Sequence, residues 1–133
     1  MPDTHEVLNQ PPHFAAYNAW RDDKLLRATV TRDGGGWIDS RADVLGATLG
    51  SEAHLLLATQ ANQHLPELRT HDSQGRRTDF VEYHPAYHEL MRIAFNAGCH
   101  SLAWTDARAG RFVARAALNY VWNQGEQGVS CPV

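Results

Sequence analysis

Apolar residues recur at helical spacing along most of the chain, which predicts an all-α fold. The first predicted helix is capped by Asp22 and ends at the glycine triplet 34–36. The second is capped by Asp39 or Ser40 and ends at Gly50, a residue type common just after a helix. The expected buried stripes are Leu25, Leu26, Thr29 and Val30 in the first helix, and Val44, Leu45, Thr48 and Leu49 in the second.

Three more helices are predicted downstream. Ser51 caps the third, which ends near His64; Pro85 opens the fourth, which stops at residues 96–98; the last covers about residues 109–124. Their expected apolar stripes are Leu55, Leu56, Ala58 and Thr59 in the third; Tyr87, Leu90, Met91, Ala94 and Phe95 in the fourth; and Phe112, Val113, Ala116, Ala117, Tyr120 and Val121 in the last, with Leu118 and Trp122 off that face.

One small β-hairpin is predicted at about residues 67–83, between the third and fourth helices. Asp72 and Gly75 occupy the first and fourth positions that a type I turn prefers, and short runs with apolar and aromatic residues flank the turn. Because an isolated hairpin is marginally stable in water, this one is expected to lean on the helices around it.

The first twenty residues differ from the rest. They hold three of the six prolines and show no helical period, so they predict an extended arm followed by a helical domain over residues 21–133. The expected anchors of the arm are Val7, Leu8, Phe14, Tyr17 and Trp20.

Composition and charge narrow the function classes. With 133 residues, 43% hydrophobic and 20% charged, the chain has the make-up of one globular domain. Its formal net charge is −3 and its basic residues are dispersed, Arg76–Arg77 being the longest basic run in the hairpin, which argues against nucleic-acid binding. No apolar run approaches the ~20 residues that span a bilayer, and the polar N-terminus lacks a basic region, so a cytoplasmic protein is expected.

Two cysteines do not make a disulfide framework. Cys99 is interpreted as a buried reduced thiol, and no neighbour of Cys131 would lower its pKa, so neither receives a role.

Two motifs resemble known ligand-binding patterns. His84 and His88 have the i, i+4 spacing of helical zinc sites, but no glutamate lies between them and Pro85 places His84 at the helix cap. Capping and packing are the preferred interpretation. The triplet Gly34–Gly36 is followed by Trp37, not by the Lys-Ser/Thr of a phosphate loop, so helix termination is preferred.

Four carboxylates, Asp72, Asp79, Glu82 and Glu89, could suggest paired acid–base groups. They fall on a turn, on both strand faces and on the polar side of a helix, which favours a solvated surface. The sequence therefore predicts no catalytic, cofactor-binding or metal-binding residue in this chain.

Three segments together resemble a known family. They are Pro66–Met91, Thr4–Pro11, and the pair His100–Trp104 with Asp106–Ala117. All three are similar to the N-terminal region of the AidB group of acyl-CoA dehydrogenases, flavoproteins linked to the bacterial response to DNA alkylation. The resemblance covers essentially the whole chain, and it corresponds to only the first part of a family member.

The resemblance implies the N-terminal helical domain of an acyl-CoA dehydrogenase, which walls the acyl-CoA side of the active site and supplies subunit contacts. In such enzymes FAD and the catalytic glutamate belong to later domains, so the chain looks truncated before the β domain and is not expected to bind FAD or to catalyse alone. The implied partners are the rest of the chain or further copies, as in the family's tetramers, with no membrane. A non-catalytic helical interaction module is the alternative, and direct nucleic-acid binding is disfavoured by the acidic balance.

Overall fold

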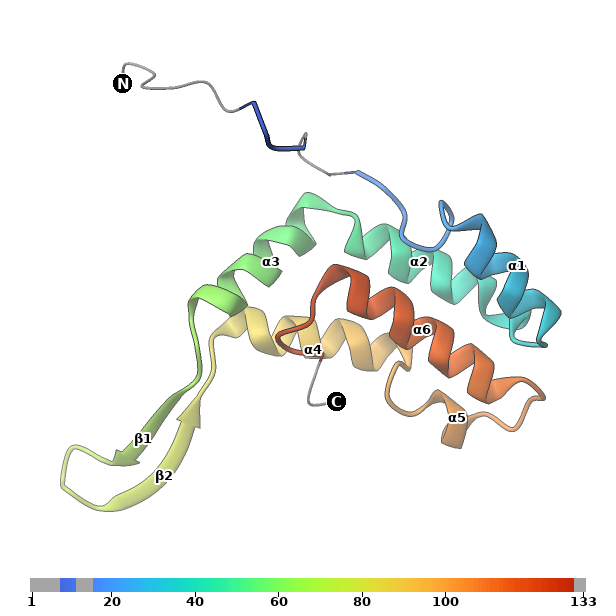
Figure 1. Cartoon of the computed structure of the whole chain (residues 1–133). Helices are drawn as coiled ribbons and strands as arrows, with labels where there is room; N and C mark the ends of the chain where they lie inside the picture. The colour runs from blue at the N-terminus through green and yellow to red at the C-terminus, as the bar shows by residue number, and fades with distance from the viewer. Residues whose placement is uncertain (1–7, 12–15, 131–133) are drawn as a thin grey trace.

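The computed structural model describes residues 8–11 and 16–130 and confirms an all-α fold with one hairpin (Figure 1). Val7, Phe14 and Cys131 lie outside the described residues. In the described part of the chain, no helix has the length and apolar character needed to cross a membrane. In chain order, the elements are α1 (Lys24–Arg32), the 3-10 helix η1 (Gly36–Ile38), α2 (Asp39–Leu49), α3 (Glu52–Gln63), β1 (Glu67–His71), β2 (Arg77–Glu82), α4 (Pro85–Ala97), α5 (Leu102–Thr105) and α6 (Arg111–Gly125).

Two predicted helix caps are confirmed. Ser51 Oγ accepts a hydrogen bond from the His54 backbone N–H at 3.2 Å, at the start of α3. His84 Nδ1 accepts from the Ala86 backbone N–H at 3.2 Å, with Pro85 in the first turn of α4. These side chains satisfy N–H groups that have no partner inside their helices.

Two predicted caps are wrong. Asp23, not Asp22, caps α1, because its carboxylate accepts from the Leu26 N–H at 2.8 Å, whereas Asp22 accepts from the Asn18 N–H at 2.9 Å. Neither Asp39 nor Ser40 caps α2, which follows directly on η1 without a side-chain cap. The Asp39 carboxylate instead accepts from Trp20 Nε1 at 2.9 Å and so ties the end of the predicted arm to the bundle.

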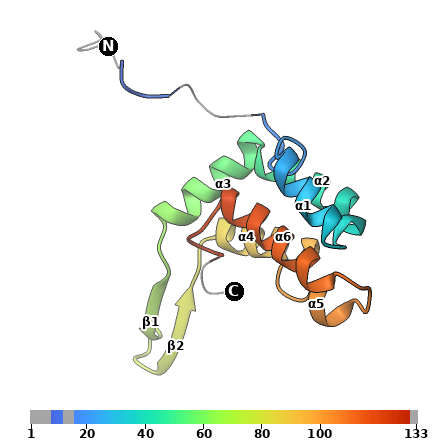
Figure 2. The ribbon, with the colours of Figure 1, turned by 45° about the vertical axis from the view of Figure 1, so that its right-hand side comes forward.

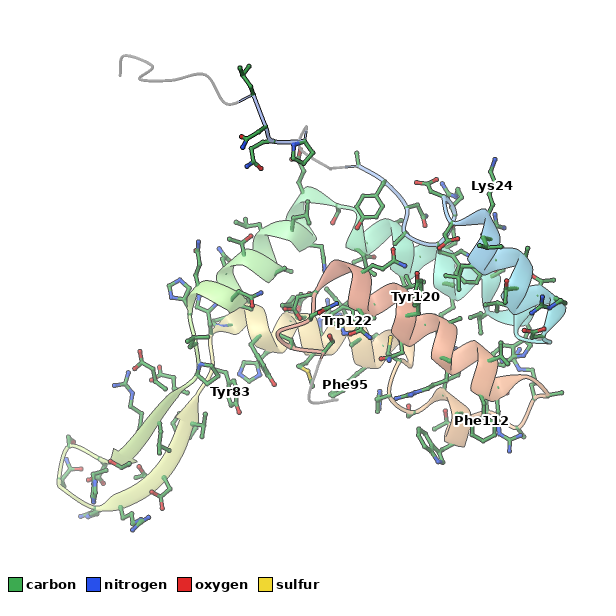
Figure 3. All side chains as sticks on the ribbon, in the orientation of Figure 1. Lys24, Tyr83, Phe95, Phe112, Tyr120 and Trp122 are labelled. Carbon is green, nitrogen blue, oxygen red and sulfur yellow. The ribbon has the colours of Figure 1, made fainter. Side chains whose placement is uncertain are left out.

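The core lies between α6 and the helices around it, and α6 presents a different face from the predicted one. Phe112, Ala116 and Tyr120 are not buried, although they were expected to be, and the rings of Phe112 and Tyr120 are exposed. Two apolar stripes overlap on this helix one residue apart, and the stripe that contains Leu118 and Trp122 is the buried one. Figure 3 shows Phe112 on the outside of α6 and Trp122 in the middle of the molecule. The buried residues of α6 are Ala114, Ala117, Leu118, Val121 and Trp122.

The predicted stripes of α1, α2 and α4 are correct at their centres and wrong at their margins. The predicted stripe of α3 is wrong, because none of its members is buried and the buried residue of that helix is His54. Val30, Leu45, Leu49, Leu90 and Ala94 are buried, and Trp20 is fully buried as an anchor, with Tyr17 packed against the core. The marginal members Leu25, Val44, Leu56 and Phe95 are exposed, as is Leu8 in the arm.

The hairpin projects away from the helices in both views (Figures 1 and 2). Every residue of β1 and β2 is exposed, so the expectation that the hairpin leans on neighbouring helices is wrong. The strands pair antiparallel, with Leu68 opposite Val81 and Arg69 opposite Phe80, and the register shifts between Arg69 and His71.

Candidate functional site

The two histidines of the metal hypothesis lie at the neck of the hairpin and contact aromatic rings. The His84 ring stacks on His64 at 4.6 Å between centroids, and His88 packs edge-on against Tyr83 and Tyr87. Among residues 8–11 and 16–130, no three His, Cys, Asp or Glu side chains are grouped so that they could hold a metal ion. The structure thus uses His84 for capping and stacking.

The glycine triplet closes α1 against the start of α6. The N–H groups of Gly34 and Gly35 donate to the carbonyls of Thr31 and Val30, so they are not free to cradle a phosphate. A Cβ on Gly35 would lie 2.9 Å from a Val30 methyl carbon and 3.1 Å from the Ala114 backbone nitrogen. The lack of a side chain at Gly35 therefore lets α1 and the start of α6 lie close together.

The four candidate carboxylates are separated and engaged by local partners. Asp72 accepts from two N–H groups of its own turn, and Asp79 pairs with Arg77 at 2.7 Å. Glu82 pairs with Arg69 at 2.9 Å, and Glu89 pairs with Arg92 on the surface of α4. No two of them form an acid–base pair.

Cys99 is buried, and burial raises the pKa of its thiol to about 11. Its Sγ lies 3.7 Å from the carbonyl oxygen of Leu118. A thiol with a raised pKa is a poor nucleophile at neutral pH, so Cys99 is a packing residue.

A cleft of about 560 Å³ lies between α2, α3 and α4. Its wall is mainly apolar, with Arg41, Glu89 and Arg92 among its polar lining residues. The cleft wall also includes His54, which is 1% exposed and packs edge-on against Trp122. Burial lowers the pKa of His54, which favours the neutral ring. His54 was not predicted as a site residue, because a histidine in an apolar run gives no signal of its own.

Arginine and aromatic side chains gather where α5 meets the first half of α6. We define the aromatic–arginine surface as Trp104, Arg111, Phe112 and Arg115. The Arg111 guanidinium lies 4.8 Å from the Phe112 ring centroid, and that of Arg115 lies 5.9 Å from the Trp104 centroid. Trp104 is 74% exposed and Phe112 is 62% exposed, so both rings face outward.

Backbone carbonyls hold the two arginines in place. Arg111 Nε donates to the Ala103 carbonyl at 3.0 Å, and Arg115 Nε donates to the Cys99 carbonyl at 2.9 Å. Beside them, Arg108 stacks 3.7 Å above the Trp37 ring and pairs with Asp106, which lowers the pKa of that carboxyl to about 2. Arg111 and Arg115 form no ion pair within the described residues.

This arrangement is suited to binding, not to proton transfer. Tryptophan, arginine and other aromatic residues are enriched at the centres of protein interfaces. Arg111 and Arg115, four residues apart on α6, were a usable signal for one helix face. Phe112 was expected in the core, so the surface was not predicted.

Comparisons with known proteins agree with the sequence resemblance. The family model described as the adaptive response protein AidB N-terminal domain matches residues 9–133. The chain is 44% identical over 131 residues to AidB of Escherichia coli (strain K12), which is described as an acyl-CoA dehydrogenase. That match covers 98% of this chain and 24% of the relative, so the chain spans about a quarter of the curated relative's length.

Two solved structures share the fold. Caenorhabditis elegans ACDH-11 in complex with C11-CoA superposes with a TM-score of 0.78 at 23% identity, covering 97% of this chain and 23% of that protein. The apo form of Bd2924 superposes with a TM-score of 0.73 at 21% identity, covering 88% of this chain and 24% of that protein.

Proposed function

The chain belongs to the family of AidB N-terminal domains, and from that membership we propose that it works as one wall of a flavin-dependent acyl-CoA dehydrogenase. In this role it closes the acyl-CoA side of the active site and supplies subunit-contact surface to a homo-oligomer such as a tetramer. A role in the response to DNA alkylation and a cytoplasmic location go with the same proposal.

The aromatic–arginine surface is the observation that carries the proposal. Large aromatic rings fixed beside arginines are typical of surfaces that another protein surface covers. Since the curated relative is about four times as long as this chain, the remaining part of the same polypeptide is the natural cover for Trp104 and Phe112.

The chemistry must then come from that remaining part. Asp79 and Glu82, two of the carboxylates considered for acid–base work, are paired with arginines. The N–H groups of Gly34 and Gly35 are engaged, so this loop does not fit a flavin cradle. FAD, if bound by the longer protein, would supply the redox chemistry. ACDH-11, which has this fold over the matched region, was solved in complex with C11-CoA, and this is consistent with an acyl-CoA ligand here.

A substitution at Phe112 tests the interface in two settings. Phe112→Asp should leave the melting temperature of the isolated chain nearly unchanged, since the ring is exposed there. In the longer protein that contains this domain, the same change should lower the melting temperature and weaken acyl-CoA binding, because it removes the covered ring and places a charged carboxylate in the interface. Leu25→Asp on α1, where Leu25 is also exposed, is the matched control.

Equal behaviour of Phe112→Asp in both proteins would contradict the proposal. So would a longer protein that melts and binds acyl-CoA as before, because the aromatic–arginine surface would then remain uncovered.

A non-catalytic interaction module is the second candidate, and the projecting hairpin favours it. The gene sequence beyond codon 133 separates the two: an open frame that encodes a flavin domain supports the dehydrogenase, and an immediate stop codon supports the module.

A further inference from the structure

The outer face of α6 carries a second apolar stripe, which adjoins the aromatic–arginine surface. Phe112, Ala116 and Tyr120 recur every four residues along the helix, and the two rings are 62% and 54% exposed. Side chains four residues apart line up as one ridge on a helix. Because large contiguous apolar patches on a domain mark surfaces that a partner covers, the covered area extends along α6 as far as Tyr120.

Arg111 and Arg115 hold donors that the described part of the chain does not use. Arg108, close to them in sequence, pairs with Asp106 at 2.6 Å. Arg111 and Arg115 instead donate through Nε to backbone carbonyls. A guanidinium has five N–H groups. Those on the two Nη atoms of each arginine find no acceptor within residues 8–11 and 16–130.

Covering this surface removes water from both guanidinium groups. A charge that loses its water is costly unless it is paired and hydrogen-bonded. The planar edge of a guanidinium matches the two oxygens of a carboxylate, and arginine is favoured for ion pairs in interfaces for this reason. The surface that covers Arg111 and Arg115 must therefore present carboxylates to them.

A second copy of this chain, placed on the same face, does not supply these carboxylates. A two-fold contact uses the same patch on both copies. Helices α5 and α6 contain no acidic residue, and Asp106 between them is already paired with Arg108. The chain covers 24% of the curated relative, so the remaining part of such a longer polypeptide has ample length to supply the cover.

We propose that a segment of the longer polypeptide, outside these 133 residues, packs along the outer stripe of α6 and pairs its carboxylates with Arg111 and Arg115. The carboxylates accept from the Nη groups, while each Nε stays on its backbone carbonyl. Phe112 and Tyr120 provide the apolar part of the contact, and the ion pairs fix the register of the segment on α6. This inference rests on the proposed function, which assigns the cover to that polypeptide, and it names the chemistry of the cover.

A zero-length cross-link tests the carboxylates. Arg111→Lys and Arg115→Lys, each made in the longer protein, keep the positive charge and add a primary amine. A carbodiimide activates a carboxyl group; the amine then forms an amide with it, and the carbodiimide leaves as its urea. Peptide mass spectrometry should find position 111 or 115 joined to an Asp or Glu beyond residue 133 of the same polypeptide. Mixing labelled and unlabelled protein identifies cross-links between copies.

Modification of the arginines needs no substitution. In the unaltered longer protein, phenylglyoxal should modify Arg111 and Arg115 slower by roughly tenfold or more than in the isolated chain, since covered groups react only through rare opening. Arg76, exposed at the hairpin tip, is the matched control and should react at similar rates in both. Coenzyme A and FAD should not be needed for the protection, because carboxylates of the polypeptide are the acceptors.

Three results would overturn the proposal. They are equal reactivity of Arg111 and Arg115 in the two proteins, protection that appears only with coenzyme A or FAD, and cross-links confined to residues 1–133 or formed between copies. Phe112→Asp, which tests the proposed function, changes no arginine. A longer protein that responds to Phe112→Asp as expected but gives no cross-link beyond residue 133 contradicts this inference alone, so the two failures are distinguishable.

Discussion

Leu118 and Phe112 lie on the same helix and should respond oppositely to truncation. Leu118 is completely buried, so Leu118→Ala should lower the free energy of unfolding by about 2–5 kcal/mol. Phe112→Ala should change it by less than about 0.5 kcal/mol in the isolated chain, because the ring is exposed. Urea denaturation followed by helical circular dichroism measures both values. A large loss of unfolding free energy in Phe112→Ala would mean that the face expected from the sequence, with Phe112, is the buried one.

The contrast shows where sequence reasoning failed on α6. Its apolar residues fill two stripes one residue apart, and periodicity alone does not choose between them. The stripe with Leu118 and Trp122 is the one that packs into the core formed with the other helices, and these tertiary contacts are not encoded in the period of α6. Phe112 was then left outside, and the aromatic–arginine surface could not be inferred.

His54 predicts a pH dependence of stability. Burial lowers its pKa below the ordinary value of 6.5, so between the folded and unfolded pKa values the unfolded chain binds more protons. Stability should therefore be full above about pH 6.5 and fall as the pH drops towards the folded pKa. His54→Leu should remove this part of the loss, measured as the difference between the pH profiles of the two unfolding free energies. Parallel profiles would mean that His54 does not titrate on unfolding.

At the scale of elements, two glycines allow the cost of a left-handed backbone to be measured separately from the cost of a packing clash. Gly110 has a φ of 76°, and a Cβ there would lie 2.2 Å from the Gly34 carbonyl oxygen. Gly75 has a φ of 79° at the hairpin tip, with open space around it. Gly75→Ala should destabilise by at most about 1–2 kcal/mol, the cost of a left-handed alanine. Gly110→Ala should cost about 1–3 kcal/mol more, because the α1–α6 approach must open. The midpoints of urea denaturation compare the two variants. Equal losses of stability would show that the loop at Gly110 shifts without cost.

The hairpin shows that local residue chemistry determines the turn but not where the hairpin lies on the molecule. The turn at Asp72–Gly75 was readable because Asp72 supplies the turn's hydrogen bonds, with its carboxylate accepting from Gln74 and Arg76. Where the hairpin lies relative to the helices depends on tertiary contacts, which residue preferences do not encode. The caps at Ser51 and His84 were likewise predictable, whereas Asp22 and Asp23 are chemically equal candidates that only geometry distinguishes.

At the scale of the whole molecule, net charge sets the expected behaviour towards nucleic acid. A chain with formal charge −3, whose aromatic–arginine surface carries only Arg111 and Arg115, can release few counterions. Duplex DNA should therefore bind more weakly than about micromolar at ~150 mM salt. Fluorescence anisotropy over a salt series measures this. Tight binding with a steep salt slope, abolished by Arg111→Ala with Arg115→Ala, would instead identify that surface as a nucleic-acid site.

Flavin binding tests whether this domain depends on the rest of a longer protein for its cofactor. The isolated chain, mixed with excess FAD and passed through gel filtration, should elute without visible flavin absorbance. Two structural facts lead to this result. The N–H groups of Gly34 and Gly35 are engaged inside the α1 terminus, and Gly110 packs against the same loop, so a pyrophosphate finds neither free donors nor room. The longer protein, treated identically, serves as the positive control. Stoichiometric flavin on the isolated chain would locate a cofactor site within these residues, and the cleft between α2, α3 and α4 would be the first place to look for it.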